Sequence, residues 1–217
     1  MRIQGLTMLL AICLAGALCS AGQAYPIVTM PTANLVSEGN AWLNYYWVDL
    51  NATNPHAPQT MQIGATYIGL TPKFELDITY LKPESVPGQT NVGVEYLALR
   101  EDRKRPAVAV GAEDITQDSG HTSLYVALAK TVTPMKDHAP SYPMVRLNLG
   151  YGTEPRSALF GGAQIRLVPE VGISALSDGH NSIYCLSYFV PKTTLVLKAG
   201  TWGDARWVGA QYTIPFR

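Results

Sequence analysis

The feature that most constrains this chain is an alternation between apolar and mixed side chains, which is clearest over residues 206–216. One parity of this stretch is apolar and holds Val208, Ala210, Tyr212, Ile214 and Phe216. The other parity is mixed and holds Trp207, Gly209, Gln211, Thr213 and Pro215. Successive side chains of a β-strand point to opposite faces, so the pattern predicts a strand. About 11 residues is also the length of a strand that crosses a bilayer at a tilt.

The same alternation recurs about a dozen times between residue 41 and the end of the chain. In its clearest instance Phe74, Leu76, Ile78 and Tyr80 are opposed by Glu75, Asp77 and Thr79. Prolines recur where every second strand is expected to begin: Pro72, Pro106, Pro143, Pro169 and Pro191. A strand tolerates a missing N–H donor at its start, so the repeating unit is a hairpin. Repeated hairpins predict an all-β chain, which we interpret as a closed antiparallel up-and-down transmembrane β-barrel of about 12 strands.

The first 24 residues are expected to be a cleavable signal peptide. A single positive charge precedes an apolar run from residue 6 to residue 18, and small residues at positions 22 and 24 suit cleavage before Tyr25. Residues 25–40, with two prolines and little periodicity, are expected to form an extended N-terminal lead-in, and residues 41–217 the barrel domain. Cleavage removes two of the three cysteines and leaves Cys185, so no intramolecular disulfide is expected.

The charge balance of the chain bears on one class of partner, nucleic acid. The chain has 16 basic and 16 acidic residues, and this balance gives no electrostatic reason to expect nucleic acid. Most charged strand residues are assigned to the face opposite the apolar one: Glu75, Asp77, Glu95, Glu113, Arg146, Arg166, Lys198 and Arg206. In a membrane barrel this face is the lumen, so these residues are the candidate pore lining. We expect the acids to pair with the basic residues or to be hydrated, because unpaired buried charges are costly. Pairing would fill the lumen, whereas water would make it a channel.

Two stretches resemble known bacterial barrels. The closing residues Tyr212, Ile214 and Phe216 resemble the terminal strand of outer-membrane barrels, which implies recognition by the barrel assembly machinery. Residues 150–152, 160–171 and 177–181, with the opening residues 30–34, are similar to a hairpin repeat of the YjbH-like outer-membrane barrel family. That resemblance implies a link to exopolysaccharide production and to exopolysaccharide-export proteins as partners, and it implies no catalytic residue.

These observations favour an outer-membrane barrel embedded in lipid, acting as a small pore or as a structural or export-associated protein without covalent chemistry. An outer-membrane lipid hydrolase or deacylase is the first alternative, with His121 or His180 as the base and Ser123 or Ser182, respectively, as the nucleophile. The second is a soluble secreted β-protein that binds carbohydrate through its tyrosines, because a sandwich shows the same periodicity with its apolar face inside. No two of the four histidines have metal-ligand spacing, so neither a metal nor a cofactor is expected.

Overall fold

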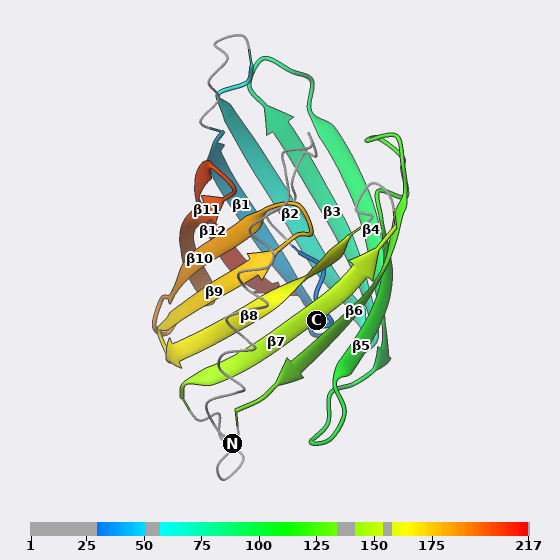
Figure 1. Ribbon diagram of the computed structural model, residues 1–217, viewed down its shortest axis with the longest axis vertical. Helices are drawn as coiled ribbons and strands as arrows, with labels where there is room; N and C mark the ends of the chain where they lie inside the picture. Colours follow the sequence, from blue (N-terminus) through cyan, green and yellow to red (C-terminus); the bar gives the residue numbers. More distant parts are fainter. Residues whose placement is uncertain (1–29, 51–56, 134–141, 154–157, 217) are drawn as a thin grey trace.

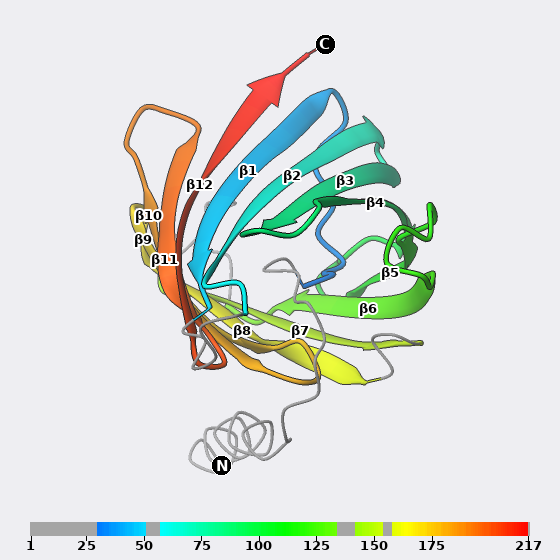
Figure 2. The same cartoon turned by 90° about the horizontal axis from the view of Figure 1, so that it is seen from above.

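The computed structural model describes residues 30–50, 57–133, 142–153 and 158–216, which form a closed antiparallel barrel (Figures 1 and 2). The expected signal peptide lies outside the described residues. The twelve strands of the described chain are β1 (Asn40–Asp49), β2 (Thr60–Thr71), β3 (Phe74–Pro83), β4 (Gln89–Leu99), β5 (Ala107–Glu113), β6 (Ser123–Thr131), β7 (Met144–Gly152), β8 (Leu159–Val168), β9 (Val171–Ser177), β10 (Ser182–Phe189), β11 (Leu195–Trp202) and β12 (Ala205–Pro215). Each strand pairs with its neighbours in the chain, and β12 pairs with β1 to close the sheet. The predicted fold class is therefore confirmed. No helix among the described residues is long and apolar enough to span a bilayer.

The five recurring prolines of the sequence all lie in connections from an even-numbered strand to the next odd-numbered one. They are Pro72, Pro106, Pro143, Pro169 and Pro191. Because the strands alternate in direction, these connections share one rim of the barrel, together with the start of β1 and the end of β12. We call this rim the proline rim. There a missing backbone donor removes no ladder hydrogen bond.

Large apolar side chains cover the outer face of the barrel. In β3, Ile78 and Tyr80 are exposed whereas Glu75 and Thr79 are buried, as the alternation predicts. In β6, where both parities hold apolar residues, Leu124 and Val126 face outward, while Ser123, Tyr125 and Ala127 are buried inside. Exposed aromatic residues recur around the wall, at Tyr45, Trp47, Tyr80, Tyr96, Tyr151, Tyr184, Tyr188 and Tyr212. Such residues suit the interface between lipid and water.

The interior is not uniformly polar, and here a sequence expectation is wrong. In β2 the apolar residues Met61, Ile63 and Ala65 face the lumen instead of lipid. They belong to an interior apolar cluster contributed by β1–β3 and β10–β12, which includes Trp202 and Trp207. A second cluster lies inside β4–β8. A barrel of this size has space that side chains can fill, so part of the lumen packs as a core.

A segment ahead of β1 turns back into the barrel (Figure 2). We call residues 30–39 the inner strap. Met30, Ala33 and Val36 are only 7%, 3% and 2% exposed, and the first two join the cluster inside β4–β8. The strap passes so close to β2 that a Cβ on Gly69 would overlap the main-chain oxygens of Val36 and Ser37. The expected lead-in is thus, over its described part, a lumen element, and the first strand begins at residue 40.

Candidate functional site in the barrel lumen

A cavity of about 230 Å³ lies in the lumen between the strap and the wall. Met30, Pro31 and Thr32 of the strap border it. Neighbouring strands β3, β4 and β5 contribute four carboxylates that line it: Glu75, Asp77, Glu95 and Glu113. Strand register brings them together, because Glu75 lies directly opposite Glu95. One wall of the cavity is therefore strongly acidic.

The two most deeply buried of these carboxylates have specific partners. Glu75, 6% exposed, accepts a hydrogen bond from the main-chain N–H of Val36 in the strap. Glu95, 4% exposed, accepts one from the hydroxyl of Tyr125 on β6 at 2.6 Å. The acidic wall thus holds the strap on one side and an interior aromatic ring on the other.

Three basic residues of the candidate lining, Lys198, Arg166 and Arg146, make contacts away from this wall. Lys198 on β11 lines the same cavity, but its Nζ donates to Gln211 Oε1 at 2.7 Å and to the Tyr46 hydroxyl at 3.4 Å. Arg166 lies near the proline rim, donates to the carbonyl of Pro169, and stacks on Phe189 with its guanidinium carbon 4.0 Å from the ring centroid.

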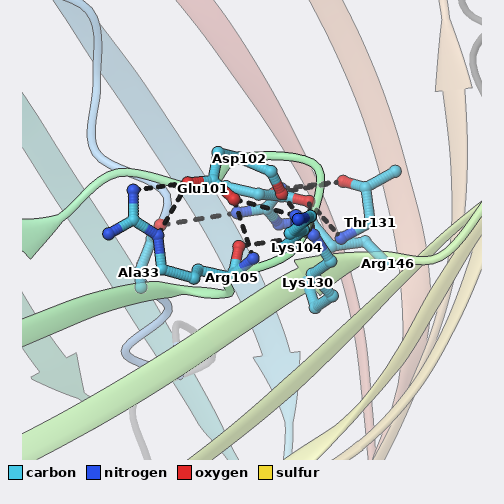
Figure 3. A network of polar contacts seen from close by, with 8 residues as sticks. All are labelled: Ala33, Glu101, Asp102, Lys104, Arg105, Lys130, Thr131 and Arg146. Atoms are coloured by element: carbon cyan, nitrogen blue, oxygen red, sulfur yellow. Dashed lines mark hydrogen bonds and ion pairs between the residues drawn. The ribbon is translucent and has the colours of Figure 1, made fainter.

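Arg146 on β7 is part of a separate polar network (Figure 3). Its Nη1 lies 2.9 Å from Oε2 of Glu101, a residue of the β4–β5 loop. Glu101 also accepts a hydrogen bond from the N–H of Thr131 at 2.7 Å. Nη2 of Arg146 donates to the carbonyl of Ala33 at 3.4 Å and so connects the network to the strap. No feature of the sequence marks Glu101 as the partner of Arg146.

The remainder of the β4–β5 loop is ordered by Asp102. Its carboxylate accepts hydrogen bonds from the N–H groups of Lys104 and Arg105, both at 2.8 Å, and from Arg105 Nε at 2.7 Å. These bonds, led by the Arg105 N–H, lower the pKa of Asp102 to about 2. At the end of β5, Asp114 plays a similar role. Burial raises its pKa, but hydrogen bonds from Ser119, Thr116 and the Asp118 N–H outweigh that effect and lower it.

Arg206 does not line the lumen, contrary to the expectation from the sequence. It shares its parity with the exposed Val208 of β12 and is itself exposed, so it lies on the outer face and not in the lumen. Its register partner on β1 is Asp49. The other seven charged residues of the candidate lining lie on inward-facing positions, and their role in conduction stays a prediction. The proposed assembly residues Tyr212, Ile214 and Phe216 are exposed along the outside of the closing strand and beyond its end.

His121 and Ser123 do not form a base and nucleophile in this structure. Ser123 is buried on the lumen side of β6 and donates to the carbonyl of Thr153 at 3.0 Å, whereas His121 is exposed before the strand. His180 lies in the β9–β10 turn, where its main-chain N–H donates to Asp178 Oδ1 at 2.8 Å. Across the described residues, no three or more His, Cys, Asp or Glu side chains form a group that could hold a metal ion.

Comparison with known proteins assigns the chain to no family. No protein-family model and no curated protein matches the chain. Among solved structures, the chain is similar to the KdgM porin in complex with disordered oligogalacturonate, at 13% identity and a TM-score of 0.49 over 80% of this chain and 98% of that one. It is also similar to the N-terminal β-barrel domain of Pseudomonas aeruginosa OprF, at 10% identity and a TM-score of 0.29 over 82% of this chain and all of that one. The resemblance to the YjbH-like family gains no support from these comparisons.

Proposed function

We propose that this protein is an outer-membrane β-barrel that forms a narrow pore, closed in the present structure by its inner strap. One observation carries the proposal: a cavity lined by charged residues lies inside a closed sheet whose outer face is apolar. An apolar exterior around a partly polar interior suits a barrel surrounded by lipid. A soluble protein would expose this apolar surface to water, which is unfavourable over so many residues.

The strap supports a closed resting state. It is buried in the lumen and contacts both Glu75 on β3 and Arg146 on β7, two strands on different parts of the wall. An element that bridges the interior in this way obstructs the path between the rims. No covalent chemistry is part of the proposal, and the link to exopolysaccharide export depends on the family resemblance alone.

Single-channel recording in planar bilayers tests the proposal. Folded wild-type protein should show rare, small conductance steps. Replacing residues 30–38 with a glycine and serine sequence of equal length should increase both step frequency and step size, because the strap contacts are lost. Glu75→Gln and Arg146→Gln, which weaken one contact each, should increase step frequency to a lesser extent.

A matched control is Glu84→Gln, which removes a carboxylate from the exposed β3–β4 turn. Folding of every variant is checked by its heat-modifiable mobility on a detergent gel. If the strap variant folds and inserts but shows no conductance steps, the proposal of a pore is wrong. A structural role in the envelope would then remain. The filled interior clusters favour that second candidate.

A further inference from the structure

The lumen cavity holds several buried polar atoms without partners. Among the described residues, nothing donates a hydrogen bond to Oε1 of Glu95, Oδ1 of Asp77 or Oδ1 of Asn91. All three side chains line the cavity, and all three atoms are acceptors. Buried acceptors without donors are rare in folded proteins because each loses its bonds to water and gains nothing in return. These three oxygens, on the neighbouring strands β3 and β4, call for a ligand that supplies donors.

A second, independent observation comes from Trp207 on β12. Its side chain is 3% exposed and lines the same cavity, yet its indole N–H has no acceptor among the described residues. Tryptophan is only a donor, so this group needs an oxygen from the ligand. It also adds an aromatic surface of the kind that attracts cations.

The acidic lining of the cavity indicates which donor group the ligand carries. Glu75, Asp77, Glu95 and Glu113 are acidic, and Lys198 is the only basic side chain on the described cavity lining. An ammonium group carries three N–H donors and a positive charge, so it matches both the orphaned acceptors and the excess of carboxylates. The carboxylates come from three strands and, among the described residues, do not form a group that could hold a metal ion.

We infer that the lumen cavity is a binding site for a small amine that also carries oxygen acceptors, such as an amino sugar. Its ammonium group lies against Glu95, Asp77 and Asn91, and one of its oxygens accepts from Trp207. The cavity of about 230 Å³ has room for one such molecule. Binding does not depend on conduction, so this inference and the proposed pore can fail separately.

Isothermal titration calorimetry on the folded, detergent-solubilised full chain tests the site. The probes are glucosamine and N-acetylglucosamine, which share a ring but differ in the ammonium group. Glucosamine should bind at least about ten-fold more tightly, because acetylation removes the charge and two N–H donors. Glu95→Gln should weaken glucosamine binding by about ten-fold or more, since charge-assisted hydrogen bonds are the stronger ones. Glu84→Gln on the exposed turn should leave binding unchanged.

If Glu95→Gln does not fold, Asp77→Asn takes its place, because its orphaned oxygen faces the same cavity. Equal affinity for the two sugars would overturn the inference, and so would the absence of glucosamine binding by folded wild-type protein. Calcium chloride is titrated in parallel. Calcium binding that is lost in Glu95→Gln, without any glucosamine binding, would show a metal site instead.

Discussion

Two interior aromatic rings in this barrel lie against glycines of the adjacent strand. A Cβ on Gly111 would overlap the ring of Tyr125, and one on Gly150 would overlap Phe160. Large rings fit inside a narrow barrel only where the wall has no side chain beneath them, so glycine here provides space. Gly111 therefore also affects the acidic wall, because the Tyr125 ring that lies against it carries the hydroxyl that donates to Glu95.

Gly111→Ala is therefore expected to disturb both packing and the buried hydrogen bond. The added methyl group must displace the Tyr125 ring and so breaks its 2.6 Å bond to Glu95. Overpacking of this kind costs about 1–3 kcal/mol of stability. The measurement is the temperature at which the folded, heat-modifiable form is lost in detergent.

The matched control is Gly64→Ala on β2, where an added Cβ has nothing within 4 Å. Tyr125→Phe separates the two effects, because it removes the hydrogen bond and retains the ring. Equal temperatures of loss of the folded form for Gly111→Ala and Gly64→Ala would contradict this account of the interior glycines.

Among the elements, the inner strap differs from every strand in how it is held. Each strand has ladder hydrogen bonds along its length, whereas the strap is fixed by a few contacts. These include the Val36 N–H bond to Glu75 and the bond from the Gly39 N–H to the carbonyl of Gly69 at 3.0 Å. Regions with few hydrogen bonds open at the lowest free-energy cost. The strap is thus the described element that is easiest to displace without unfolding the wall.

Gly69→Val should push the strap away from β2, because a side chain there overlaps main-chain atoms that cannot rotate aside. Cys185 reports the change, since it faces the cavity that the strap borders. We expect a charged methanethiosulfonate reagent to modify Cys185 several-fold faster in Gly69→Val than in wild type.

Gly64→Val is the control, because it adds the same side chain to the same strand at a position where a Cβ meets nothing. Equal modification rates in the two variants would show that the strap does not limit access to the cavity. Conductance is not needed for this measurement, so it tests the position of the strap separately from the pore.

For the whole molecule, closure between β1 and β12 leaves no free sheet edge. An open edge cannot exist in hydrocarbon, because its backbone groups would lack hydrogen bonds. Tyr212 and Ile214 on the outside of the closing strand, and Phe216 just beyond it, are exposed and contribute little to the interior. A loss of barrel formation on changing them would reflect assembly and not core packing.

Replacing these three residues together with alanine should reduce the amount of heat-modifiable barrel in the outer-membrane fraction several-fold. The matched control replaces Tyr184, Leu186 and Tyr188, three exposed outward residues of β10. If both triple variants reach the membrane in equal amounts, the closing residues are no special assembly signal. Recovery of wild-type protein in the soluble fraction would contradict the membrane location itself.

The sequence alone determined the class of fold, the number of strands and, for most strands, which residues share a face. These properties depend on period-two alternation and on turn residues, which are local. It also located seven charged residues that face inward. The same rule failed for Met61 and Ile63, which are apolar but fill the lumen, and for Arg206, which was assigned to the wrong parity.

Only the tertiary structure decided which groups meet across the barrel. Arg146 pairs with Glu101, 45 residues away, and reaches Ala33, 113 residues away. Alternation states which residues lie on one face, but closure of the sheet sets which strands lie next to one another and how much interior remains to be filled. The strap shows no periodicity, so its place became visible only once the wall around it had closed.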